Sequence, residues 1–194
     1  MDVAKAVEAA AEAARDSGLE VVEVQPPMVN EAVGAWGTLL NAEVEYSLAP
    51  VARKHGSTQI QELLGQYRDI FGVPDLDGFI AAQAQRNAAR RAWAEMFQSI
   101  DAVILPVCAQ VPFKLEQDFE HPETVPDIMR AHRVLYMINL LGLPGATVRT
   151  LDSRPVPLGV QVVGPQMGDG ACLDVAGRIE KTLGFDLRPI DPKF

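Results

Sequence analysis

The spacing of apolar residues divides the chain into alternating helical and extended segments. Near the N-terminus small apolar side chains recur every three or four positions, the pattern of one buried helix face; they are Val3, Ala6, Val7, Ala10 and Ala14. Together with Gly18 as a stop, this pattern predicts a helix over 3–16. The same spacing predicts further helices over 30–48, 79–99 and 169–183. A capping-box pattern indicates a helix over 58–70, and one more is expected over 126–141.

Short apolar runs bounded by proline or glycine predict strands between these helices. Leu19–Val24 (LEVVEV) follows the first helix, and Asp101–Pro106 (DAVILP) follows the fourth. Leu141–Pro165 (LGLPGATVRTLDSRPVPLGVQVVGP) contains two such runs, with a polar turn at Asp152–Pro155. Helices that alternate with short buried strands predict an α/β fold.

The ends of the central helices are predicted from local signals. Pro50 is expected to close the helix over 30–48, and Thr58 with Gln61 has the spacing of a capping box. Gly72–Gly78 is rich in turn residues, and the acidic, proline-rich Val111–Pro126 is expected to form an exposed loop. Because no repeat or linker interrupts the chain, residues 1–194 are expected to form one domain without an internal boundary.

Composition excludes several classes of function. The net charge is −9 and the largest basic cluster is the pair Arg90-Arg91, so no nucleic-acid partner is expected. No apolar run approaches the ~18 residues of a membrane span, and the start of the chain does not resemble a signal peptide. Cys108 and Cys172 lie far apart without a metal-binding motif, which favours the reducing cytoplasm.

The sequence offers no clear catalytic group. A serine nucleophile needs a base and backbone N–H donors, and none of the serines lies in a Gly-x-Ser-x-Gly, Gly-Ser-Ser or Ser-x-x-Lys pattern; they are Ser17, Ser47, Ser57, Ser99 and Ser153. Each is interpreted as a helix cap, a turn residue or a helix-surface residue. The histidines His55, His121 and His132 form no metal-binding pair, and no cofactor or metal is expected.

Cys108 is a separate candidate for a catalytic nucleophile, because it follows the end of a predicted strand. A thiolate nucleophile needs a base or a positive neighbour, and His121 or His132 would have to lie beside it in the fold. A buried, unreactive cysteine is the simpler interpretation.

Three segments together resemble the C-terminal portion of the amidase signature family, in the order found there. They are RNAARRAWAEMFQSIDAVILPVCA (Arg86–Ala109), NLLGLPGATV (Asn139–Val148) and VPLGVQVVGP (Val156–Pro165). The resemblance implies a three-layer α/β/α sandwich around a mixed sheet, of which this chain is the C-terminal part. One departure is Val148-Arg149-Thr150, where the family usually continues Val-Pro-x-Gly, and this places a charge near the predicted pocket rim.

The resemblance also implies hydrolysis of an amide bond by a Ser–cis-Ser–Lys triad. That triad belongs to the family's N-terminal half, which has no counterpart here. The lysines of this chain do not match the catalytic position; they are Lys5, Lys54, Lys114, Lys181 and Lys193. No catalytic residue is therefore assigned.

Trp36, Tyr136 and Asn139 are the predicted substrate-binding residues, because this half of such enzymes helps to shape the acyl side of the pocket. The alternative is that both aromatic side chains belong only to the core. Gln161 lies among valines in the second quoted strand, and we interpret it as structural because an unpaired buried amide costs about 1–3 kcal/mol.

Three functional hypotheses follow. In the first, the chain is the C-terminal portion of an amidase that acts on a non-peptide amide and is inactive alone. In the second, it is a stand-alone, non-catalytic amidase-like domain that binds a small molecule or scaffolds a partner. In the third, it is a small enzyme that uses Cys108. On the first hypothesis an uncovered sheet edge and apolar face would cause poor solubility or association into a homodimer.

Overall fold

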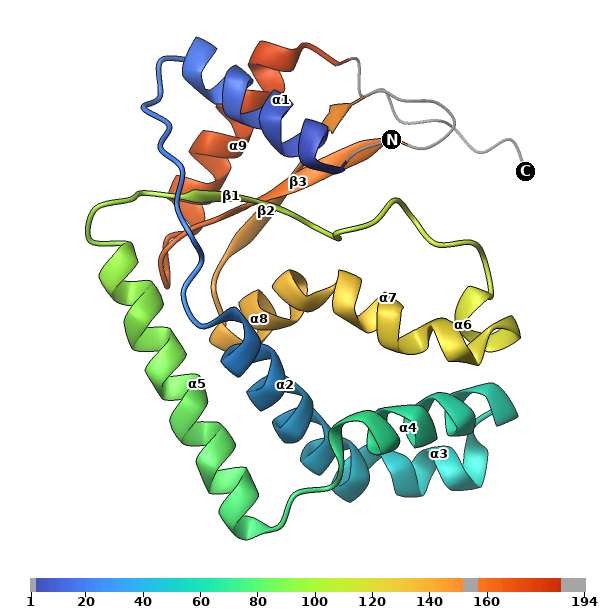
Figure 1. The fold of residues 1–194 in the computed structure, drawn as a ribbon. Helices are drawn as coiled ribbons and strands as arrows, with labels where there is room; N and C mark the ends of the chain where they lie inside the picture. Colours follow the sequence, from blue (N-terminus) through green and yellow to red (C-terminus); the bar gives the residue numbers. More distant parts are fainter. Residues whose placement is uncertain (1–2, 152–156, 186–194) are drawn as a thin grey trace.

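The computed structural model describes residues 3–151 and 157–185 of the chain (Figure 1). In chain order its helices are α1 (Val3–Asp16), α2 (Val29–Glu43), α3 (Ala49–His55), α4 (Thr58–Phe71), α5 (Leu76–Met96), α6 (Gln117–Glu120), α7 (Val125–Ala131), α8 (Arg133–Leu141) and α9 (Asp169–Leu183). A π-helical segment η1 (Val44–Leu48) joins α2 to α3, and a 3-10 turn η2 (Pro122–Thr124) precedes α7. The strands are β1 (Val103–Pro106), β2 (Gly145–Leu151) and β3 (Leu158–Val163).

The three strands form one sheet in the order β1-β3-β2. Both pairings are antiparallel, with Val163 of β3 opposite Val103 on one side and opposite Gly145 on the other. The α/β prediction is confirmed. The described part of the sheet is antiparallel, because β2 and β3 are consecutive neighbouring strands and β1 runs opposite to β3. The resemblance implied a mixed sheet instead.

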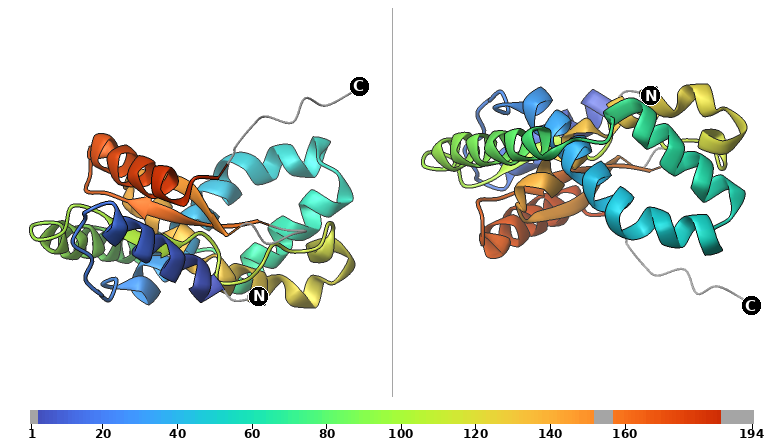
Figure 2. Two further views of the ribbon diagram at one scale, coloured as in Figure 1. Left: turned by 90° about the horizontal axis from the view of Figure 1, so that it is seen from above. Right: turned by 90° about the horizontal axis from the view of Figure 1, so that it is seen from below.

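Helices cover both faces of this sheet and give three layers. Helices α1 and α9 lie over one face, while α2, α5 and α8 lie on the other side (Figure 1). The alternation of side chains along β1 explains the two cores, because Val103 and Leu105 join the core with α2, α5 and α8, whereas Ile104 packs against the core with α1 and α9. Figure 2 shows the molecule from the side of α1 and α9 (left) and from the opposite side, where α3, α4 and α5 lie nearest (right).

The predicted strand over Leu19–Val24 is wrong. The segment is extended but pairs with no described strand. Leu19 and Val21 pack against the core beneath α1 and α9, while Val24 packs against the other core. The segment therefore crosses from one layer to the other past the sheet (Figure 1).

The sequence predicts that Pro50 closes the second helix, and this prediction is wrong. The helical path continues from α2 through η1 into α3, with Pro50 in the first turn of α3. Proline is tolerated there because the first helical N–H groups need no intrahelical partner, and a wider π turn relieves the clash with the preceding carbonyl.

The other helix boundaries shift by a few residues. The cap of α4 is Ser57, whose hydroxyl accepts the N–H of Ile60, and not Thr58. Helix α5 begins after the cap Asp75, so Gly78 lies inside the helix and not in the joint. The predicted loop over 111–126 contains the short turns α6 and η2, and His132 divides the helix predicted over 126–141 into α7 and α8. Helix α9 has the predicted bounds, and the turn Asp152–Pro155 lies outside the described residues.

Gln161 is buried, with 4% of its surface exposed, and its amide Nε2 donates a hydrogen bond to the carbonyl of Pro106 at 3.0 Å. The amide therefore ties β3 to the end of β1 and has the partner that burial requires. This geometry supports the structural interpretation of Gln161.

Candidate functional site: an aromatic cluster between three helices

Aromatic side chains from three helices meet on the side of the molecule away from α1 and α9. The aromatic cluster consists of Trp36 on α2, Tyr67 and Phe71 on α4, His132 before α8 and Tyr136 on α8. These residues lie up to 100 positions apart in the chain, and the packing of α2 against both α4 and α8 brings them together.

Trp36 and Tyr136 stack face to face. Their ring centroids are 3.9 Å apart and the ring planes differ by 5°. Phe71 meets Trp36 edge-on, with centroids 5.9 Å apart at an angle of 82°. The edge-on contact has the usual spacing of a favourable aromatic pair and the stacked contact is closer; such pairs are worth about 0.5–1.5 kcal/mol beyond the area they bury. The structure thus joins two of the three predicted site residues.

Gly37 makes room for this arrangement. A side-chain carbon at position 37 would lie 2.0 Å from the ring of Phe71, so only glycine allows the ring to occupy this place against α2. The residue beside Trp36 therefore decides where Phe71 packs.

Two tyrosine hydroxyl groups add a polar element to the cluster. Tyr67 and Tyr136 share a hydrogen bond. Burial raises the pKa of Tyr136 to about 12, and the neighbouring Tyr67 adds to this shift. Burial also raises the pKa of Tyr67, although the hydrogen bond to Tyr136 opposes it. Both phenols are therefore neutral at physiological pH and act as hydrogen-bonding groups, not as bases.

His132 and the chain after β1 extend the cluster. The His132 ring lies 5.3 Å from Phe113 and 6.0 Å from Tyr136, measured between centroids. Its Nδ1 is 2.9 Å from the carbonyl of Ile128, which only accepts, so Nδ1 carries the proton and Nε2 is left as the second polar atom of the ring. Cys108 is a half-buried thiol close enough to Tyr136 to affect its pKa.

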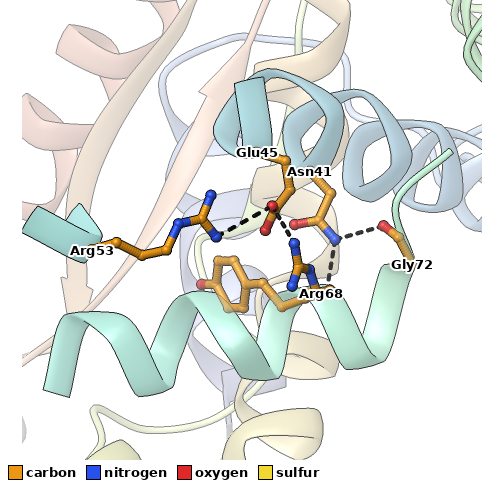
Figure 3. A network of polar contacts seen from close by, with 6 residues as sticks. Asn41, Glu45, Arg53, Arg68 and Gly72 are labelled. Carbon is orange, nitrogen blue, oxygen red and sulfur yellow. Dashed lines mark hydrogen bonds and ion pairs between the residues drawn. The ribbon is translucent and has the colours of Figure 1, made fainter. Parts of the chain in front are cut away.

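A network of polar contacts holds α2 to α4 beside the cluster (Figure 3). Asn41 is buried, and its Nδ2 donates hydrogen bonds to the carbonyl of Tyr67 at 3.0 Å and to that of Gly72 at 2.7 Å. Glu45 pairs with Arg68 of α4 and lies 3.8 Å from Arg53 of α3. Asn41 satisfies two carbonyl groups at the end of α4, and so fixes the helix that carries Tyr67 and Phe71.

Asn139, the third predicted site residue, is exposed on α8 and takes part in none of the aromatic contacts. Its predicted contact with substrate stays a prediction. Sequence analysis missed Tyr67, Phe71 and Asn41. The helix predicted over 58–70 included Tyr67 but ended before Phe71, and no sequence signal indicated that Asn41 was buried.

The hydroxyl groups of the described serines form hydrogen bonds with backbone groups. Ser17, Ser47 and Ser99 donate to carbonyls of the preceding turn, and Ser57 caps α4. These contacts agree with the predicted cap and turn roles; Ser153 lies outside the described residues. The described lysines are all exposed; they are Lys5, Lys54, Lys114 and Lys181.

No metal or membrane element is found in the described part of the chain. Among residues 3–151 and 157–185 there is no group of three or more His, Cys, Asp or Glu side chains that would hold a metal ion. None of the described helices has the length and apolar character needed to cross a membrane. Arg149, expected near a pocket rim, places its guanidinium over the ring of Phe185.

Comparison with known proteins identifies the family of this chain. The family model described as Amidase matches residues 1–173. The chain belongs to the amidase family.

The similar proteins share this family but differ in what they act on. An indoleacetamide hydrolase of Bradyrhizobium japonicum is 30% identical over 189 residues, which cover 95% of this chain and 41% of that protein. A glutamyl-tRNA(Gln) amidotransferase component of Caldanaerobacter subterraneus is 23% identical over 210 residues, covering 96% of this chain and 42% of that protein. The chain therefore spans about two fifths of the length of these relatives.

The fold itself is shared with solved structures. An allophanate hydrolase of Kluyveromyces lactis matches with a TM-score of 0.77 at 20% sequence identity, over 94% of this chain and 30% of that chain. These values establish a common fold.

Proposed function

We propose that this chain is the C-terminal portion of an amidase that hydrolyses a non-peptide amide to a carboxylate and ammonia or an amine. The match of the amidase family model to residues 1–173 is the observation that carries the proposal. The serine nucleophile and the lysine base of the reaction would belong to a preceding part of the protein, since each described serine and lysine serves the backbone or faces solvent. The chain would then be catalytically inactive alone.

In this proposal the aromatic cluster forms one wall of the substrate pocket. Trp36 and Tyr136 would present apolar ring surface to the acyl group, and Asn139 would bind the substrate from the exposed side of α8. The relative that hydrolyses indoleacetamide acts on an aromatic amide, and this favours an amide with an apolar or aromatic acyl group. We further propose a cytoplasmic location, because both cysteines are free.

The second candidate is a stand-alone amidase-like domain that binds a small molecule or scaffolds a partner. The observation that favours it is the pair of well-formed cores on both faces of the sheet, which the chain builds from its own described residues. The aromatic cluster would serve as a binding wall in this case as well.

The intact mass of the protein isolated from its own cells separates the two candidates. We expect a species well above 21.0 kDa, with Gly/Ser-rich sequence before Met1, that releases ammonia from aryl or aliphatic amides. Replacing Tyr136 by leucine in that species is expected to raise KM more than it lowers kcat, because the residue binds and does not react. A mass of 21.0 kDa without ammonia release from any amide would support the stand-alone domain instead.

A further inference from the structure

A second concave site lies at another place in the fold. It is a groove of about 240 Å³ lined by Arg90, Ala94 and Phe97 of α5, Leu141 and Leu143 at the end of α8, and the Pro165–Gln166 loop. None of these residues belongs to the aromatic cluster. The volume is close to the ~300–1,000 Å³ that is usual for small-molecule sites.

Only two of the residues that line the groove have polar side chains, Arg90 and Gln166. Arg90 is half-buried at the groove and forms no ion pair or hydrogen bond with any described residue. Gln166 supplies an amide, and the remaining lining is apolar. Arg86, one turn earlier on α5, already donates its Nε to the carbonyl of Leu140 at 2.9 Å, so Arg90 is the cation left to receive a ligand among the groove-lining residues.

Hydrogen bonds and close packing hold the wall opposite α5 in place. The N–H of Gly164 donates to the carbonyl of Pro144 at 3.1 Å, which joins the turn before β2 to the turn after β3. Cys172 donates to the same carbonyl, and Gly164 must be glycine because a side-chain carbon there would lie 2.7 Å from the Cys172 sulfur. A preformed groove loses less conformational entropy when it binds.

The backbone beside Gln166 is held in an unusual conformation. Met167 has φ +64° and an almost fully exposed side chain, so no packing of that side chain explains the left-handed backbone. The N–H of Gly168 donates to the carbonyl of Pro165 at 2.8 Å and closes a tight turn around it. Such outliers occur where a loop is fixed for a function, and here the turn fixes Gln166 at the groove.

We propose that this groove binds a small monocarboxylate with an apolar, aromatic-sized body. The carboxylate would take two N–H donors of Arg90, with the Gln166 amide beside it, and the body would lie against Phe97 and Leu143. One guanidinium matches one carboxylate, whereas a phosphate group would call for more positive charge than this acidic chain offers here. The proposal is independent of the amidase function, since it uses no residue of the aromatic cluster.

Equilibrium dialysis of the full 194-residue chain against labelled phenylacetate tests it, with phenylacetamide as a neutral ligand of the same shape. We expect phenylacetate to bind and phenylacetamide to bind at least about 10-fold more weakly. Arg90→Gln is expected to weaken phenylacetate binding about 10-fold or more. Arg91→Gln, which removes the same charge from an exposed neighbour outside the groove, is expected to leave binding unchanged.

A filled groove provides the second test. Ala94 is exposed at the groove, so Ala94→Trp adds bulk there without disturbing the core and is expected to abolish phenylacetate binding. Circular dichroism melting would verify that each variant is folded. Equal effects of the two arginine variants, unchanged binding by Ala94→Trp, or no phenylacetate binding at about 10 mM would overturn the proposal.

Discussion

The ring of Phe71 occupies the space that Gly37 leaves open on α2, so that a methyl group at position 37 would lie 2.0 Å from a ring carbon. This relationship couples a residue inside α2 to the last residue of α4, and it fixes the edge-on contact between Phe71 and Trp36.

Gly37→Ala is therefore expected to destabilise the protein although alanine favours helices. The displaced ring would cost about 1–3 kcal/mol in the free energy of unfolding, measured by urea denaturation. Gly34→Ala in the same helix is the matched control, because nothing lies within 4 Å of its new methyl group. It is expected to stabilise the protein by up to ~1 kcal/mol. Equal changes in both variants would show that Phe71 does not pack against Gly37.

Asn41 is expected to be the polar residue on which the position of α4 depends most. Asn41→Leu removes the donor to the carbonyls of Tyr67 and Gly72 and is expected to cost about 1–3 kcal/mol in the free energy of unfolding. Thr38→Ala removes an exposed hydroxyl one turn earlier and is expected to change stability by less than about 0.5 kcal/mol. Hydrogen exchange of α4 amides should rise in the first variant alone, and unchanged exchange would contradict the role given to Asn41.

Local sequence signals predicted the elements that depend on local physics. Helix α9 was predicted with its bounds because its apolar spacing ends at a glycine, and β1 and β3 because short apolar runs end at proline or glycine. Leu19–Val24 has the same signals but forms no strand, since a strand also needs a neighbour, and this segment crosses between layers.

The candidate site was only half predictable, because it too depends on contacts between segments that are distant in the sequence. The sequence predicts Trp36 and Tyr136 separately as wall residues, but their stacking depends on the packing of α2 against α8. Tyr67 and Phe71 come from α4, a helix with no fully buried residue, so nothing in its own pattern distinguishes these two from the rest of its apolar side. The glycine at position 37 became informative only with its neighbour in place.

The tyrosine pair is expected to make stability fall at alkaline pH. Because the pKa of Tyr136 rises to about 12 on folding, the unfolded chain ionises first, near the usual pKa of about 10. The stabilising contribution is full below pH ~10 and is lost as the pH rises toward about 12. After screening by solvent, the loss is expected to be on the order of 1 kcal/mol. Urea denaturation across this range measures it, and Tyr136→Phe, which keeps the stacked ring, should reduce the slope. An unchanged slope in that variant would contradict the assignment to Tyr136.

The start of α5 is expected to drive self-association of the 194-residue chain. Leu76 and Ile80 lie one turn apart on α5 with 73% and 57% of their surfaces exposed, and Val73 just before them is 51% exposed. Neighbouring exposed apolar side chains of this size are typical of surfaces that bind another protein. Sedimentation velocity at increasing concentration should therefore show a dimer or larger species.

Charge placed on this surface separates a specific contact from general insolubility. The pair Leu76→Lys and Ile80→Lys is expected to return the chain to a monomer, because burying two ammonium groups without partners opposes association. Leu173→Lys on α9 is the matched control, since Leu173 is 66% exposed but far along the chain from this surface. If the control variant dissociates the dimer to the same extent, the start of α5 is not the dimer contact. The same conclusion follows if the unchanged chain sediments as a monomer at every concentration. If only the α5 variant dissociates, the apolar start of α5 is the surface that a partner, whether a second copy or the preceding part of an amidase, would cover.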